Sequence, residues 1–212
     1  MRTEILTASQ RAVLDALTPL AWPGAFYLAG GTALALRHGH RRSIDFDFFR
    51  PDPFDAAAVL AELESVFDIV ERMPSGPRTV YVRLRGVTTS FFEYKYPLLE
   101  PAEATSWGFG LAADLDIAAM KVEAVAGRGS RKDFVDLRML CATGLGLDEI
   151  LDAFDRKYGT GRVERYHRLR ALAYFEDAER QPMPEMLTAF EWDEAKRFFA
   201  LESARLLREG IG

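Results

Sequence analysis

The chain has 212 residues, of which 49% are hydrophobic and 28% charged, and its 27 basic against 32 acidic side chains give a net charge of −5. This length predicts one domain with a substantial core, or a domain with a helical extension. The acidic balance excludes a protein that binds nucleic acid over its whole surface, although it allows a local basic patch. The single cysteine, Cys141, excludes an internal disulfide. With no apolar run of membrane-spanning length and no signal-peptide pattern at the N-terminus, we expect a cytoplasmic protein that does not contact membranes.

The first hundred residues predict an α+β unit with a mixed sheet. Alternating or short apolar runs indicate strands, and amphipathic or capped runs indicate helices, with Asp52 as a candidate N-cap. In chain order we expect a helix over 8–20, a strand over 25–29, a helix over 32–37, a strand over 43–49, a helix over 53–66, a strand over 67–72 and an antiparallel hairpin of 79–84 with 87–94.

The second half of the chain is helical by pattern. Pro97 and Pro101 mark the change in composition, and apart from a short run near 107–113 no further strand is indicated. We therefore expect two domains, an α/β core over residues 1–100 and a helical bundle over residues 101–212 that completes the functional site. The expected helices cover residues 115–127, 132–142, 148–157, 162–175 and 191–208.

The strand predicted over residues 43–49, SIDFDFF, carries the strongest chemical signal. Successive side chains of a strand point to opposite faces, so Asp45 and Asp47 share a face with Ser43. Two like charges this close are unfavourable unless water covers them or a cation lies between them. The first alternative is a solvated polar face. The second is a magnesium site, because Mg²⁺ is typically bound by one or two carboxylates together with substrate phosphates.

Two adjacent glycines, Gly30 and Gly31, stand where the strand of residues 25–29 turns into a helix. The first backbone N–H groups of a helix have no intrahelical partner and form a natural position for a phosphate. Glycines at such a turn also occur for steric reasons alone. The pair becomes informative because the two aspartates follow it within twenty residues.

Further candidates lie downstream. Glu93 interrupts an apolar strand, where it is either a third carboxylate ligand or a surface partner of Lys95 or Arg83. Lys121 is surrounded by apolar residues, so it either extends to solvent or points at an anion such as a triphosphate. Asp133 and Asp136 share one face of the next helix. Asp133 is placed to favour the helix dipole, whereas Asp136 is suited to orient a lysine.

Taken together, these motifs resemble the AbiEii/AbiGii-type nucleotidyl transferase family, which belongs to the polymerase-β-like nucleotidyltransferase superfold and includes MenT-like toxins. The resemblance covers about residues 8–208, and it is the combination of motifs that is specific. The matching segments are GGTAL at 30–34, HRRSIDFDFF at 40–49, DIAAMK at 116–121 and RGSRKDFVDL at 128–137.

The resemblance implies roles for individual residues. Gly30, Gly31 and Ser43 would hold the triphosphate, with Thr32 and Arg42 beside them. The metal, Mg²⁺ or Mn²⁺, would be bound by Asp45 and Asp47, and by Glu93 on the basis of strand position alone. In the second half, Lys121 would contact a nucleotide phosphate, and Asp136, together with Asp133, would complete the site. We therefore expect Lys121 and Asp136 within roughly 10 Å of the two metal-binding aspartates.

The resemblance also implies an activity. The chain would transfer NMP from an NTP to the 3′ end of tRNA, to another RNA or to a protein hydroxyl. Studied relatives use GTP or CTP. It would be the toxin of a type IV toxin–antitoxin or abortive-infection system with a cognate antitoxin. The alternative is a nucleotide-binding protein that is catalytically silent or depends on a partner. A basic rim for the acceptor, or ordinary solvated charge, is formed by Arg37, Arg41, Arg42, Arg50, Arg128, Arg131 and Lys132.

Overall fold

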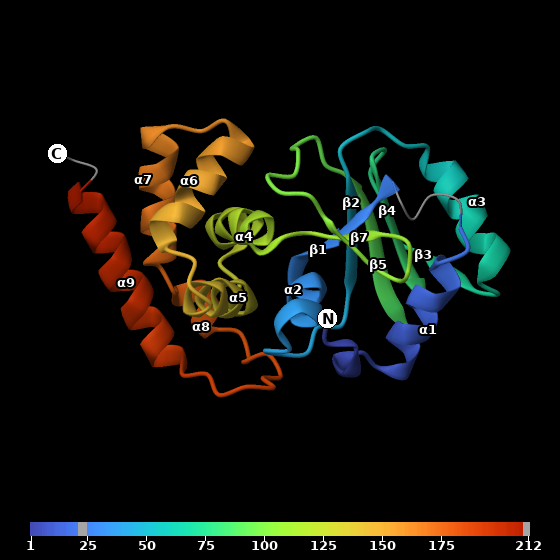
Figure 1. Ribbon diagram of the computed structural model, residues 1–212, viewed down its shortest axis with the longest axis horizontal. Coiled ribbons are helices and arrows are strands. Elements are labelled where there is room, and N and C mark those ends of the chain that lie inside the picture. The colour runs from blue at the N-terminus through green and yellow to red at the C-terminus, as the bar shows by residue number, and fades with distance from the viewer. Residues whose placement is uncertain (21–24, 210–212) are drawn as a thin grey trace. The chain divides into compact units, whose positions relative to one another are not determined.

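The computed structural model describes residues 1–20 and 25–209, which fall into two compact units, Met1–Ala113 and Asp114–Gly212. The first unit combines a mixed sheet with helices, and the second consists of helices (Figure 1). This confirms the predicted fold class, an α+β core followed by a helical bundle. The observed boundary follows Ala113 rather than residue 100, because two short strands between these positions join the sheet of the first unit.

The sheet has seven strands within the described residues, in the order β3-β4-β5-β2-β1-β7-β6. Strand β1 pairs antiparallel with β2 and parallel with β7, and β2 pairs parallel with β5. This mixture places β1 and β2 side by side near the centre of the sheet. The two glycines follow β1 directly, and Asp47 of the Asp-x-Asp motif lies on β2. The strands are β1 (Tyr27–Ala29), β2 (Phe46–Arg50), β3 (Val70–Arg72), β4 (Thr79–Leu84), β5 (Val87–Glu93), β6 (Glu103–Ala104) and β7 (Gly110–Leu111).

The predicted hairpin is confirmed as β4 and β5, which pair antiparallel from Thr79 to Glu93. Its connection is the two-residue turn of Arg85 and Gly86, both with positive φ, at 48° and 80°. Such a turn matches the right-handed twist of the flanking strands and favours glycine. The alternation of TVYVRL then buries Val80, Val82 and Leu84 on one face of the sheet.

The two faces of the sheet differ in chemistry. On one face Phe48 of β2 stacks on Phe91 of β5, with ring centroids 5.2 Å apart and both side chains buried. The helices α1 (Ala8–Leu17) and α3 (Ala56–Val66) cover this apolar face, and α2 (Gly30–His38) lies on the opposite side of the sheet (Figure 1). Because side chains alternate along β2, Asp47 and Phe49 point to the side of α2.

Two sequence predictions about local structure were wrong. Strand β2 begins at Phe46 rather than Ser43, and Ile44 is 73% exposed instead of lying with the buried phenylalanines. Residues 43–45 are therefore an extended connection to the strand. The helix α3 is capped by Asp55, whose Oδ1 accepts a hydrogen bond from the Ala57 N–H at 2.9 Å, and not by Asp52. The first turn of α3 begins at Ala56, so the carboxylate placed to satisfy its free N–H groups is that of Asp55, and Asp52 lies three residues before this cap.

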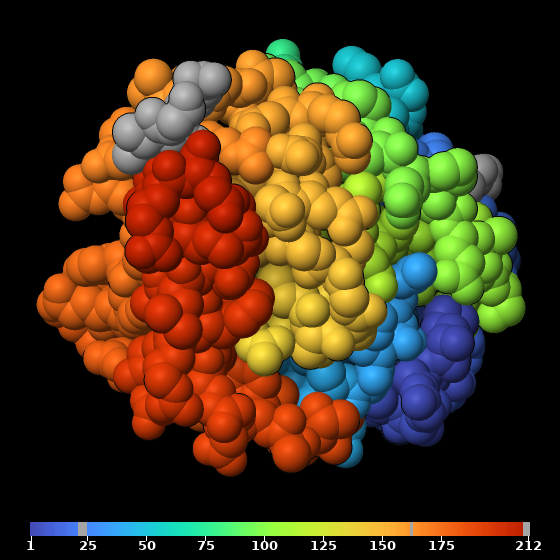
Figure 2. All heavy atoms as spheres, turned by 60° about the vertical axis from the view of Figure 1, so that its left-hand side comes forward, coloured from blue at the N-terminus to red at the C-terminus, as the bar shows by residue number. Residues whose placement is uncertain are grey.

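The second unit is built around the pair α4 and α5, which contact each other and the surrounding helices α6, α7, α8 and α9. Figure 2 shows α9 at the surface of this unit. Cys141 on α5 is half-buried, and burial raises the pKa of its thiol to about 12. The helices are α4 (Asp114–Arg128), α5 (Arg131–Ala142), α6 (Leu147–Tyr158), α7 (Arg162–Leu172), α8 (Glu176–Glu179) and α9 (Trp192–Glu209).

Across residues 1–20 and 25–209, no helix is both long and apolar enough to cross a membrane. The remaining element is a short 3-10 helix, η1 (Thr3–Ile5), ahead of α1.

Candidate functional site

The glycine pair adjoins the Asp-x-Asp strand because β1 and β2 are neighbours. Ala29, the last residue of β1, is in register with Asp47, and α2 begins at the next residue. Gly30 has a φ of +69°, in the left-handed region that favours glycine. A Cβ on Gly30 would lie 3.0 Å from Oδ2 of Asp47. The carboxylate therefore packs directly against the glycine at the start of the helix.

Gly31 leaves room for two further polar groups. A Cβ at this position would collide with Nη2 of Arg41 and lie 3.1 Å from Oγ of Ser43. The structure thus brings together four of the predicted residues, Gly30, Gly31, Ser43 and Asp47, which we call the glycine-turn site. The N-cap residue of α2 is Ala29, which has no side chain that could accept a capping hydrogen bond. The first N–H groups of α2 and the helix dipole favour an anion at this position.

Gln10 holds Ser43 in place from α1. Its Oε1 accepts a hydrogen bond from the Thr7 N–H at 3.0 Å, and the Thr7 hydroxyl accepts one from the Gln10 N–H at 3.1 Å, which is a capping box. The Nε2 of Gln10 then donates to the carbonyl of Ser43 at 2.8 Å. With only 3% of Gln10 exposed, this amide is a fixed link between the cap of α1 and the glycine-turn site.

Two residues predicted to bind nucleotide have their side chains engaged with the backbone. The hydroxyl of Thr32 donates to the carbonyl of Asp45, and Thr32 is buried. Nη1 of Arg42 donates to the carbonyl of Ile5 at 3.0 Å. Thr32 thus joins α2 to the segment before β2, and Arg42 is directed toward the N-terminal helix η1. Both contacts support the backbone around the glycine-turn site.

Asp45 and Asp47 are both half-buried, so each keeps part of its surface open. Among the residues that the structure describes, no group of three or more histidine, cysteine, aspartate or glutamate side chains is placed to hold a metal ion. A carboxylate such as that of Asp47 at the start of α2 still fits Mg²⁺, which needs one or two carboxylates when substrate phosphates supply the other ligands. The donor set, carboxylate oxygens with a hydroxyl nearby, suits a hard cation and not a soft one.

The structure does not bring Glu93 to the aspartates. In the parallel pairing of β2 with β5, Asp47 is in register with Ser90 and Arg50 with Glu93. Glu93 is therefore three residues further along the sheet and on its opposite face. Its carboxylate pairs with Arg78 at 3.3 Å rather than with Lys95 or Arg83. This register corrects the prediction that Glu93 is a third metal ligand. The register between two strands cannot be read from the position of a residue in the sequence.

The remaining candidates form a buried cluster in the second unit. Nζ of Lys121 on α4 lies 2.7 Å from Oδ1 of Asp133 and 2.6 Å from Oδ2 of Asp136, both on α5. The Asp133 and Asp136 side chains have no exposed surface, and that of Lys121 is 6% exposed. Asp136 thus orients the lysine, as the sequence suggested, and Asp133 does the same instead of serving only the helix dipole.

Arg128 also joins this cluster, because its Nε lies 2.7 Å from Oδ2 of Asp133. Burial by itself raises the pKa of Asp133, but Lys121 and Arg128 outweigh this effect and hold the pKa below the ordinary value of an aspartate. Arg131 is engaged as well, donating to the carbonyls of Ala178 and Glu179. Arg128 and Arg131, two of the arginines proposed for a basic rim, therefore both make contacts within the helical unit.

Sequence reasoning missed a second buried pair in this unit. Nζ of Lys157 on α6 lies 2.7 Å from Oδ1 of Asp116 on α4, and neither side chain is exposed. The signal was present in the helical period, because Lys157 follows Ile150 and Phe154 on the buried face of α6. The expectation that Lys121 and Asp136 lie near Asp45 and Asp47 joins residues of different units and stays a prediction.

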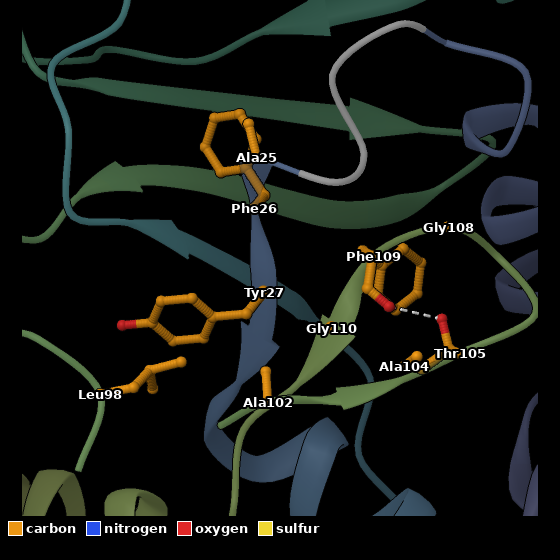
Figure 3. Close-up of a pocket in the computed structure, with 10 residues that line it drawn as sticks. All are labelled: Ala25, Phe26, Tyr27, Leu98, Ala102, Ala104, Thr105, Gly108, Phe109 and Gly110. Carbon is orange, nitrogen blue, oxygen red and sulfur yellow. Dashed lines mark hydrogen bonds between the residues drawn. The ribbon is translucent and has the colours of Figure 1, made fainter. Parts of the chain in front are cut away.

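A cavity of about 310 Å³ in the first unit is separate from the glycine-turn site (Figure 3). Apolar side chains dominate its lining, including Phe26, Leu98 and Phe109. The hydroxyl of Thr105 at its edge donates to the Phe109 carbonyl at 2.7 Å. The cavity contains none of the predicted site residues, so the candidate chemistry lies at the glycine turn.

Comparison with known proteins places the chain in the nucleotidyltransferase class. A family model described as "Nucleotidyl transferase AbiEii toxin, Type IV TA system" matches residues 12–103, which include the glycine-turn site. Over the whole chain, "Uncharacterized protein aq_aa25" of Aquifex aeolicus (strain VF5) is 40% identical across 198 residues, 92% of this chain and 94% of that protein. The chain belongs to the AbiEii nucleotidyl transferase toxin family.

Solved structures agree in fold. MenT4, a nucleotidyltransferase toxin from Mycobacterium tuberculosis H37Rv, superposes with a TM-score of 0.61 and 18% identity, covering 91% of this chain and 82% of its own. JHP933 from Helicobacter pylori superposes with a TM-score of 0.56 and 15% identity, covering 94% and 89% of the two chains. At this identity the likeness concerns the fold, and it covers more than nine tenths of this chain in both cases.

Proposed function

We propose that the protein is a Mg²⁺-dependent nucleotidyltransferase that moves NMP from an NTP to a hydroxyl group, with the 3′ end of tRNA as the leading acceptor and another RNA or a protein hydroxyl as alternatives. The observation that carries this is the glycine-turn site, where the N-terminus of α2, a serine hydroxyl and a carboxylate meet at two glycines. Membership of a toxin family supports a role as the toxin of a type IV pair with a cognate antitoxin. The activity would take place in the cytoplasm, where NTPs and tRNA are present.

The residues of the site suit each part of this reaction. The N–H groups at Gly30 and Gly31 would bind the β- and γ-phosphates, because charge grows there as pyrophosphate leaves. Ser43 would donate its hydroxyl to a phosphate oxygen. Asp45 and Asp47 would hold the divalent cation, Mg²⁺ or Mn²⁺, which when bound neutralises the triphosphate and activates the attacking hydroxyl. The new phosphodiester bond forms at the α-phosphate as the bond to pyrophosphate breaks.

The test is incubation of the protein with each of the four α-labelled NTPs, total tRNA and Mg²⁺, followed by gel separation of labelled RNA and protein. We expect transfer from one or two NTPs, GTP or CTP first. Asp47→Asn should lower the rate by about 10²–10³-fold, the size of losing one group that stabilises developing charge. Asp52→Asn is the matched control, because this exposed aspartate lies five residues away, beyond the end of β2. Transfer that survives in Asp47→Asn would contradict the proposal.

The second candidate is a nucleotide-binding protein that is silent without a partner. It is favoured by the engagement of Lys121 with two buried aspartates, which leaves this lysine committed inside the helical unit. Calorimetry separates the two candidates. Binding of Mg²⁺·NTP with no labelled product, in the presence of tRNA, would favour the silent protein.

A further inference from the structure

The helix α7 carries apolar and aromatic side chains on its outer face. It packs on α4 and α9 within the helical unit (Figure 1), and the buried positions of α7 are leucines. Away from these leucines, Val163 is 66% exposed and Tyr166 43% exposed, and both His167 and Arg170 are exposed as well. The four positions are spaced i, i+3, i+4 and i+7, so they share one face of the helix. We call these four residues the α7 stripe.

Tyr166 lies at the centre of the α7 stripe. Its ring is 5.8 Å from that of His167 in an edge-to-face arrangement, and the guanidinium of Arg170 lies 5.9 Å from the Tyr166 centroid. Within residues 1–20 and 25–209, no carboxylate lies at ion-pairing distance from Arg170, so solvent alone screens its charge. An exposed aromatic ring with an arginine beside it offers a nucleobase a surface for stacking and a phosphate a cation.

The charge around the stripe is opposite in sign to that of the whole chain. Residues 156–170 contain six lysine and arginine side chains and one glutamate, whereas the chain has a net charge of −5. The glutamate, Glu164, turns back to the start of its own helix, where its Oε2 accepts a hydrogen bond from the N-cap N–H at 3.2 Å. Arg165 and Arg168 pair with carboxylates of α6 and α4, and Arg170 keeps its charge on the outer face. This local basic excess is complementary to a polyanion.

We propose that the α7 stripe binds single-stranded RNA, with a base stacked on the Tyr166 ring and a phosphate held by Arg170. RNA fits this surface better than a protein partner does. A stable protein interface needs a broad apolar centre, and Val163 is the only aliphatic member of the stripe. The inference rests on the proposed function, because it assigns the surface that binds the RNA acceptor.

Stacking on Tyr166 makes the binding sensitive to the form of the RNA. Bases in a duplex are already stacked on one another and do not offer a free face, whereas unpaired bases do. A single strand should therefore bind more tightly than a duplex of the same sequence. Charge alone would not produce this order, because a duplex carries the higher density of phosphates.

The experiment measures binding of a fluorescein-labelled single-stranded RNA of about 12 nucleotides to the full chain by fluorescence anisotropy, without NTP. Tyr166→Leu is expected to weaken binding about 5–100-fold, because leucine keeps an apolar side chain but cannot stack a base. Tyr166→Phe keeps the ring and should bind as the wild type does. Arg170→Gln should weaken binding and reduce the slope of log affinity against log salt concentration by about 0.7, the value for one phosphate contact.

The matched control is Arg197→Gln, which removes an exposed arginine from α9 in the same unit and should change neither the affinity nor the salt slope. Polyglutamate tests the other occupant, an acidic protein surface, as a competitor of the labelled RNA. Unchanged binding in Tyr166→Leu would overturn the proposal. So would an equal loss in Arg197→Gln, or competition by polyglutamate as strong as that by unlabelled RNA.

The binding assay contains no NTP, so its failure is distinguishable from a failure of the proposed function. RNA binding through the stripe with no transfer from any NTP would refute the proposed function alone. Transfer of NMP by a wild type that binds no single-stranded RNA would refute this inference alone. Where both hold, Tyr166→Leu should raise the KM for tRNA and leave kcat and the KM for NTP unchanged.

Discussion

The two units of the protein treat their aspartates in opposite ways. In the first unit, Asp45 and Asp47 are half-buried, and the carboxylate of Asp47 packs against Gly30 at the start of a helix. In the second unit, Asp133 and Asp136 have no exposed surface and lie within 2.7 Å of the Lys121 ammonium. The first arrangement keeps part of each aspartate exposed to solvent, and the second encloses the carboxylates in contacts between helices.

The difference shows why a carboxylate pair in a sequence does not by itself indicate a binding site. A buried aspartate without a compensating cation is so unfavourable that the chain must supply a partner, as Lys121 and Arg128 do. A partly open aspartate has no such need, because water or a metal ion serves it. The predictions below test whether the two groups of acids behave accordingly.

The largest effect on stability is expected from Lys121→Met. It leaves Asp133 and Asp136 buried without the ammonium that lies 2.7 and 2.6 Å away, and removing one member of a buried ion pair costs about 3–5 kcal/mol. Urea unfolding monitored by circular dichroism measures this change. The control is Lys132→Met on the exposed surface of α5, which should change stability by less than about 0.5 kcal/mol. Unchanged stability of Lys121→Met combined with lost nucleotide binding would instead assign this lysine to the phosphates.

A smaller effect concerns pH. The pKa of Asp133 is lower in the folded chain than the ordinary value, so the unfolded state binds more protons as the pH falls toward 4 and below. The stabilisation from this aspartate is therefore complete above the unfolded pKa of about 3.9 and is lost as the pH drops through the folded value. Stability measured between pH 6 and 3 should fall less steeply in Asp133→Asn than in the wild type. Parallel pH profiles would show that Lys121 and Arg128 do not hold this carboxylate ionised.

The smallest effect is expected from Glu93→Gln. Its carboxylate faces away from Asp47, and its side chain is 11% exposed whereas that of its partner Arg78 is 73% exposed. Because solvent reaches Arg78 and screens the pair, its contribution to stability is on the order of 1 kcal/mol. The transfer rate and its dependence on Mg²⁺ should therefore match those of the wild type, as measured by titrating the metal in the labelled-NTP assay. A rate loss comparable to that of Asp47→Asn would return Glu93 to the set of metal ligands and contradict the strand register.

Much of the fold follows from local patterns. The alternation of TVYVRL together with the Arg85-Gly86 turn predicted β4 and β5 closely, and helical periods predicted α4, α5, α6 and α9 to within a residue or two at each end. These signals are strong because each depends on residues close in sequence. The predicted start of β2 was wrong because it relied on the same local signal. Ile44 fits the alternation of the strand but is 73% exposed in the folded chain.

The sequence by itself determined the class of the protein and singled out Gly30, Gly31, Ser43 and Asp47, because the glycine pair and the Ser-x-Asp-x-Asp pattern are motifs of residues close together in the chain. Only the tertiary structure decided which face each acid occupies and which cation neutralises it. The register of β2 against β5 separates Glu93 from Asp47, and the packing of α4 on α5 commits Lys121 to two aspartates. Both outcomes depend on contacts between segments far apart in the chain, where strand order, register and burial set the cost of each charge.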